Sequence, residues 1–111
     1  MKIITEISIL DLKEMAKNFF GNMVKAVADI DKNLIALDAE LHSDLESLLI
    51  ENGSKQNDLW RINFYPDEVE DFLEFDSMIN IRPSQNNFSR GVEKEDVRKI
   101  ISDLVQKAIK R

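Results

Sequence analysis

Hydrophobic and polar residues alternate from Met23 to His42, which is the pattern of a β-hairpin with one buried face. A two-residue turn at Lys32-Asn33 makes one face of this hairpin wholly apolar. The same register sets Lys25 across from Glu40 on the polar face. Because a shift of one residue would bring carboxylates into the core, the alternation predicts this register.

A second pair of alternating segments, residues 59–65 and 72–81, predicts another hairpin around Pro66-Asp67. When the apolar positions of its two strands are matched, Arg61 lies across from Asp76 and Asn63 lies across from Glu74 on the polar face. The second strand is expected to run unbroken to the polar loop that follows it.

Three further segments have the period of an α-helix. Ser8 is placed as the N-cap of a helix that ends at Gly21. Residues 43–46 form a capping box, which predicts that the second helix begins at Asp44. An apolar stripe from Val97 to Ala108 predicts the third helix.

With a first strand at residues 2–6, the predicted order is β-α-β-β-α-β-β-α. This order indicates one α+β domain that spans residues 1–111. We expect a two-layer sandwich, in which a mostly antiparallel five-stranded sheet carries three helices on one face. Its polar face would then be open to solvent.

Composition limits the classes of function. The formal net charge of −6 disfavours non-specific nucleic-acid binding, because that binding needs many phosphate contacts. No apolar run approaches the roughly 20 residues of a membrane span, and no signal-peptide core is present, so we expect a cytoplasmic protein. The chain has no cysteine, which excludes disulfides and thiolate chemistry. Its three glycines form neither a Walker loop nor a dinucleotide fingerprint, so no cofactor is expected.

The polar sheet face offers one set of candidate residues: Glu40, His42, Asp76 and Asn80. The only histidine could perform acid/base chemistry with Glu40 or Asp76. Charges that pair across the strands of an ordinary solvated face account for the same pattern. We expect no metal site, because no second histidine and no cysteine can complete a familiar ligand set.

The loop that follows residue 81 is the stronger candidate site. Between Ser77 and Val92 the chain carries two arginines and no acidic residue, although it is acidic overall. Arginine binds carboxylate or phosphate through two parallel hydrogen bonds, and the neighbouring amides and hydroxyls could add donors. The candidate ligand-binding residues are Arg82, Ser84, Gln85, Asn86, Asn87, Ser89 and Arg90. In the alternative interpretation these residues make local turns and both arginines pair with surface acids.

Four segments resemble a prokaryotic family of small proteins, the domain of unknown function five-six-seven-four. They are FFGNMVKAV at residues 19–27, ELH at 40–42, GSKQ at 53–56 with Leu59-Trp60, and EFDSMINIRPSQ at 74–85. The resemblance covers nearly the whole chain. It implies no activity and no catalytic residues, since the family has none assigned.

Three hypotheses about function follow, and the sequence does not decide whether the protein is an enzyme. The first is a binding module for a small anion, or for the acidic group of a partner, at the loop from Arg82 to Arg90. The second is a small hydrolase-like enzyme that uses His42 with Glu40 or Asp76. The third is an interaction protein that forms a homodimer through its sheet.

Overall fold

The computed structural model describes all residues from 1 to 111. Its centre is a five-stranded antiparallel sheet with the order β1-β4-β3-β5-β6. These strands are β1 (Lys2–Ile4), β3 (Val24–Asp29), β4 (Leu34–Leu37), β5 (Leu59–Phe64) and β6 (Leu73–Glu74). The helices are α1 (Ile9–Asn18), α2 (His42–Glu51) and α3 (Glu95–Ala108). The predicted α+β class, with three helices and a five-stranded antiparallel sheet, is confirmed.

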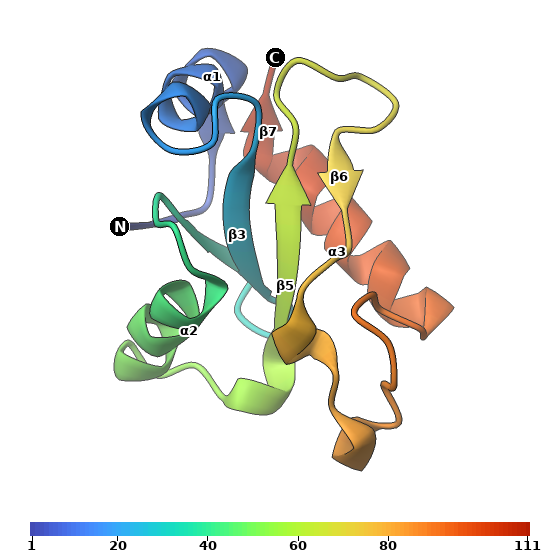
Figure 1. Ribbon diagram of the computed structural model, residues 1–111. Coiled ribbons are helices and arrows are strands. Elements are labelled where there is room, and N and C mark those ends of the chain that lie inside the picture. The colour runs from blue at the N-terminus through green and yellow to red at the C-terminus, as the bar shows by residue number, and fades with distance from the viewer.

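The helices cover both faces of the sheet, so the prediction that all three lie on one face is wrong (Figure 1). Helices α1 and α3 pack on the face that carries Ala26 and Ile62 in the main hydrophobic core. Helix α2 packs on the opposite face, where Val27 and Ala36 form a second, smaller core with Leu45. The face predicted to be open is therefore covered over part of its width.

The first hairpin has a register two residues away from the predicted one. Ala28 pairs with Ile35, and β4 ends at Leu37, so Lys25 has Asn63 of β5 as its neighbour instead of Glu40. The turn is longer because the buried Asp29 carboxylate accepts hydrogen bonds from the amides of residues 31 and 32, both at 2.9 Å. A shift of two residues keeps every side chain on its predicted face.

The second hairpin has the predicted register only at its start. Asn63 pairs with Glu74, as expected, but β6 stops there and a 3-10 turn occupies residues 78–80. The amide side chain of Asn80 accepts from the Arg61 backbone N–H at 3.0 Å and donates to the Arg61 carbonyl at 2.9 Å. This side chain satisfies the backbone groups of Arg61 that a longer β6 would have paired. The prediction that Arg61 lies across from Asp76 is therefore wrong.

The helix boundaries are set by local chemistry. Ser8 caps α1 and accepts from the Asp11 amide at 3.1 Å, as predicted. Helix α2 begins at His42, two residues before the predicted start, and no side chain caps it.

Two short strands, β2 (Ile7–Ser8) and β7 (Ile109–Lys110), pair in parallel and form a second sheet. None of the helices combines the length and the apolar character needed to cross a membrane.

Candidate functional site

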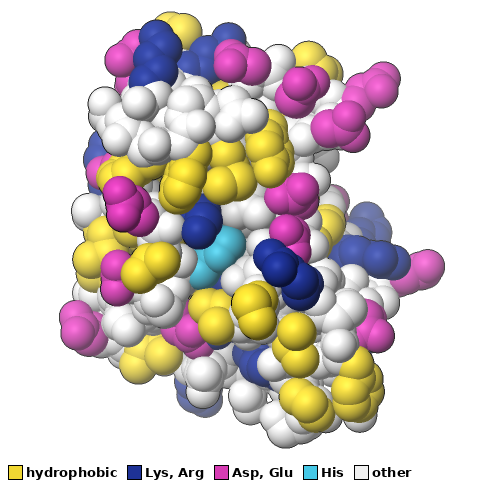
Figure 2. All heavy atoms as spheres, viewed as in Figure 1, with side chains coloured by type: hydrophobic (Ala, Val, Ile, Leu, Met, Phe, Trp, Pro, Cys, Tyr) yellow, Lys and Arg dark blue, Asp and Glu magenta, His cyan; other side chains and the backbone are white.

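A hollow of about 510 Å³ lies beside the first turn of α2, within the size range of small-molecule sites. Figure 2 shows the single histidine at the centre of this hollowed face, next to a basic side chain. Strands β3, β5 and β6 and the segment after β6 complete its wall. The polar residues that line it are Lys25, His42, Ser43, Asn63, Tyr65, Glu74, Asp76, Ser77 and Arg90.

His42 is held as a neutral base at the floor of the hollow. The residue is 8% exposed, and its Nε2 lies 2.8 Å from the carbonyl oxygen of Ile62. A carbonyl only accepts, so Nε2 carries the proton and Nδ1 keeps its lone pair. Burial, assisted by the charge of Lys25, lowers the pKa of His42 below 6.5. The imidazole is therefore uncharged at neutral pH.

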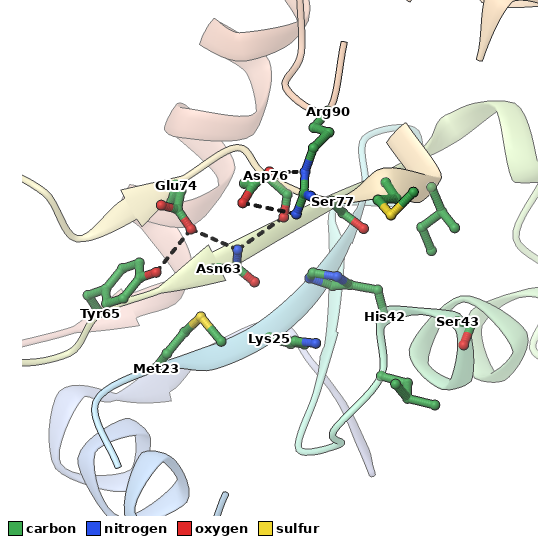
Figure 3. A pocket seen from close by; sticks show the side chains of 13 residues that line it. Met23, Lys25, His42, Ser43, Asn63, Tyr65, Glu74, Asp76, Ser77 and Arg90 are labelled. Atoms are coloured by element: carbon green, nitrogen blue, oxygen red, sulfur yellow. Dashed lines mark hydrogen bonds and ion pairs between the residues drawn. The ribbon is translucent and has the colours of Figure 1, made fainter. Parts of the chain in front are cut away.

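Asn63 and Glu74 form a hydrogen-bonded wall opposite His42 (Figure 3). Asn63 Nδ2 donates to Glu74 Oε1 at 2.9 Å, and the hydroxyl of Tyr65 donates to the same oxygen at 3.0 Å. Burial and the Glu74 carboxylate raise the pKa of Tyr65, which keeps the phenol protonated as a donor. Asn63 is 4% exposed and its Oδ1 has no partner. The wall thus has oxygen atoms, on Asn63 and Glu74, that could accept further hydrogen bonds.

Lys25 and the start of α2 supply the positive side of the hollow. The Lys25 ammonium lies 5.1 Å from the centre of the Phe20 ring, and none of the ion pairs in the structure includes it. The first N–H groups of any helix lack partners within the helix, and α2 has no capping side chain. Arg90, in contrast, is engaged, because its Nε and Nη2 donate to the Asp76 carboxylate at 2.6 and 3.3 Å.

The arginine of the predicted anion loop is occupied by the protein itself. Arg82 donates from Nη1 to the Gln56 carbonyl at 2.8 Å and from Nη2 to the Leu59 carbonyl at 2.7 Å. Its guanidinium stacks on Trp60, with 4.2 Å between the guanidinium carbon and the ring centre. Burial and the charge of Arg61 lower the pKa of Arg82 to about 10, so it is still a cation at neutral pH. These contacts attach the loop to the sheet.

The other predicted loop residues build a closed turn. The backbone of Arg82 pairs with that of Asn87, and Asn86 takes the left-handed conformation at φ 58°. Asn87 is buried and donates to the carbonyls of residues 80, 89 and 91 at 2.8, 3.1 and 2.8 Å. Gln85 donates to the Asn57 carbonyl at 3.0 Å, whereas Ser84 is exposed. Four of the seven side chains proposed as ligand donors thus already bond within the protein: those of Arg82, Gln85, Asn87 and Arg90.

Two loop amides do bind an anion, which is the carboxylate of Glu93. The amides of Phe88 and Ser89 both donate to Glu93 Oε2, the latter at 3.1 Å. The backbone amide of Glu93 in turn donates to Asn87 Oδ1 at 2.9 Å. Asp76 and Glu93 stand just outside the two ends of the acid-free run, and together they neutralise it.

Of the four candidate residues predicted on the polar sheet face, two line the hollow and two do not. His42 and Asp76 line the hollow. Glu40 is exposed outside it, and Asn80 is buried in hydrogen bonds to the backbone. No group of three or more His, Asp or Glu side chains is arranged to hold a metal ion.

Sequence reasoning did not single out Lys25 or Tyr65 as site residues. Lys25 had been assigned an acidic neighbour, Glu40, by the two-residue error in register. The earlier start of α2 then brings His42 and Ser43 next to it. The sequence signal that could have indicated the hollow was the predicted pairing of Asn63 with Glu74. This pairing is correct, and both residues lie in the wall of the hollow opposite Lys25.

Comparison with known proteins gives a family but no activity. A family model described as Protein of unknown function (DUF5674) matches residues 1–108. No curated protein and no solved structure matches the chain. The match covers almost the entire sequence and agrees with the resemblance in the four segments above. The chain therefore belongs to the DUF5674 family of proteins of unknown function.

Proposed function

We propose that this protein binds a small anionic molecule in the hollow between β3 and the start of α2. The observation that carries the proposal is the Lys25 ammonium, which lines the hollow and has no carboxylate partner. In a chain of net charge −6, with many more acids than are needed to pair its bases, a lysine left unpaired in a concave site favours an external anion.

The start of α2 supports the same proposal. Its free N–H groups and the positive end of the helix dipole stabilise negative charge, and residues 41–43 line the hollow. This feature alone would not define a site. Lys25 supplies the independent evidence, because its ammonium lines the same hollow from β3 and has no carboxylate partner.

This proposal keeps anion binding as the function and moves its location. At the loop from Arg82 to Arg90, both terminal nitrogens of Arg82 already donate to backbone carbonyls, and Nε and Nη2 of Arg90 donate to Asp76. A free ligand would have to displace the Asp76 carboxylate from Arg90, whereas it would displace no carboxylate from Lys25. The hollow is thus the less costly place for an anion.

Chemical-shift titration with phosphate, sulfate and small dicarboxylates tests the proposal. We expect the amides of His42 and Ser43 and the Lys25 ammonium to shift first, with weaker binding at higher salt. Lys25→Gln should weaken binding by at least about tenfold, the size of one charged hydrogen bond. Lys2→Gln, which also removes a strand lysine but at the exposed β1 edge, is the matched control and should bind normally. Shifts confined to residues 82–90 would place the anion at the loop instead and refute the site proposed here.

A hydrolase-like enzyme is the second candidate, favoured by the free Nδ1 of His42. Neither Glu40 nor Asp76 orients the imidazole, because the Ile62 carbonyl does so. In such an enzyme Nδ1 would take a proton from water as the water oxygen bonds to the carbonyl carbon of a bound ester. It would return that proton to the alkoxide oxygen as the ester C–O bond breaks and the alcohol leaves. Turnover of small anionic esters that is lost in His42→Gln would support it, and equal turnover in the variant would exclude this role.

A homodimer formed through the sheet stays a proposal. The sheet surface available for such a contact is smaller than the open face expected from the sequence. Helix α2 covers part of the sheet face that would have formed the contact, and the edge strands β1 and β6 are short. Sedimentation of the protein over a range of concentrations tests it, and a constant monomer mass would contradict it.

A further inference from the structure

We infer that the ligand of this hollow also carries an ammonium group, as a free amino acid with an apolar side chain does. The inference rests on the proposed function, since it takes the hollow as the binding site. It adds the chemical class of the ligand, and it follows from the wall that faces Lys25.

The wall opposite Lys25 is built to accept hydrogen bonds. Glu74 receives two bonds, from Asn63 and Tyr65, and both end on Oε1. Its second oxygen, Oε2, accepts none, and no basic residue pairs with Glu74. A carboxylate held in position by two donors, with one oxygen unused, is a prepared receptor for a cationic donor.

The floor of the hollow also lacks donors. The buried Oδ1 of Asn63 accepts no hydrogen bond within the protein. Asn63 is 4% exposed, so water compensates this oxygen poorly. An ammonium that enters between His42 and Glu74 brings three donors to a place where acceptors are in excess.

The charges of the hollow are separated in the same way as those of a zwitterion. Figure 3 shows Lys25 and the start of α2 on one side, and Glu74 with Tyr65 on the other. The remaining pair, Asp76 and Arg90, neutralises itself. A ligand with only negative charge gains from Lys25 but is repelled by Glu74, whereas an amino acid satisfies both sides.

Apolar residues flank the polar centre of the hollow. They are Met23, Leu41, Met78 and Ile79. Leu41 is 53% exposed and Met78 is 68% exposed, so both have apolar surface free for contact. An apolar side chain on the ligand would cover this surface and be stabilised by its burial. Among amino acids, leucine and methionine therefore fit better than glycine.

The experiment compares three ligands that differ by one group each. L-leucine has both charges, 4-methylpentanoate lacks the ammonium, and isopentylamine lacks the carboxylate. In chemical-shift titrations of the wild-type protein, we expect leucine to bind at least about tenfold more tightly than either analogue, and more tightly than glycine. The shifts should centre on Lys25, His42 and Glu74.

A substitution in the acceptor wall sharpens the test. Glu74→Gln keeps the oxygen that receives Asn63 and Tyr65 but removes the charge. It should weaken leucine binding about tenfold and strengthen binding of 4-methylpentanoate, because the repulsion is gone. Glu70→Gln, an exposed position in the same hairpin, is the matched control and should leave both affinities unchanged. Melting temperatures of both variants verify that they are folded.

The possible outcomes separate the two proposals. If 4-methylpentanoate binds the hollow as tightly as leucine, the ammonium inference is wrong and the proposed anion site stands. If phosphate and dicarboxylates bind there but leucine does not, the ligand class is again wrong. If none of these molecules perturbs Lys25 or His42, both proposals fail.

Discussion

Removal of the Glu46 carboxylate should strongly destabilise the protein, because its partner is a buried arginine. Glu46 of α2 accepts a hydrogen bond from Nη2 of Arg61, whose side chain is 1% exposed. Nη1 of Arg61 donates to the Leu59 carbonyl at 3.0 Å, and Nε has no partner. Arg82 donates to the same carbonyl at 2.7 Å. Glu46 is therefore the carboxylate that offsets two neighbouring buried or half-buried cations.

The size of the effect follows from the burial of Arg61. Breaking a buried ion pair by removing one partner costs about 3–5 kcal/mol, because the remaining charge stays in a poorly solvated position. The total stability of a domain of this kind is about 5–15 kcal/mol, so Glu46→Ala should remove a large fraction of it. Glu51→Ala changes an exposed residue of the same helix that makes no ion pair, and should stay within about 0.5 kcal/mol.

Urea unfolding monitored through the only tryptophan gives the measurement, since Trp60 packs under Arg82 close to the pair. The double variant Glu46→Leu/Arg61→Met removes both charges and should recover most of the loss, because an apolar pair carries no desolvation penalty. A loss below about 1 kcal/mol in Glu46→Ala would refute the reasoning. It would mean that water reaches Arg61 or that the Leu59 carbonyl alone satisfies it.

Three further predictions concern single positions. Asn87→Ala should cost about 4 kcal/mol, since it removes three donated bonds and one accepted bond of roughly 1 kcal/mol each, and Ser84→Ala in the same loop should cost nothing measurable by urea unfolding. Stability should fall as the pH drops below about 6.5, because the unfolded chain protonates His42 at its ordinary pKa while burial lowers the folded one, and His42→Gln should lose this part of the pH profile. Gly53→Ala should lower stability by about 1–2 kcal/mol, measured by thermal unfolding, because Gly53 has φ 97° and a new Cβ would lie 2.9 Å from Lys32 Nζ.

Sequence patterns predicted the elements whose cause is local. The hydroxyl of Ser8 caps α1 because the amide it needs is three residues away, and such spacing can be recognised in the sequence. The pairing of Asn63 with Glu74 follows from alternation on both sides of one turn. Patterns of this range predicted the α+β class and the side of β3, β4 and β5 that faces the main core.

The register of the first hairpin could not be derived in the same way. Alternation distinguishes a shift of one residue but not a shift of two, because the second leaves each side chain on the same face. The side chain of Asp29 decides between the two registers, since it folds back on the next amides and lengthens the turn. The position of α2 was missed because the face predicted to be open also carries Val27 and Ala36, which are apolar and pack in one core with Leu45 of α2.

The run between Ser77 and Val92 has no acidic residue in the sequence, but whether its arginines are unpaired depends on which residues lie near them in the fold. Asp76 and Glu93 lie one residue beyond the ends of this run, and they bind Arg90 and the loop amides. Lys25 is the one charged residue between Met23 and Ala28, and the sequence pattern does not single it out. It lacks a carboxylate partner because β4 ends before Glu40 can pair with it. The net charge of a sequence window therefore predicts anion sites that are in fact neutralised by acidic residues just outside the window. It misses sites such as the one at Lys25, where tertiary structure moves the expected partner away.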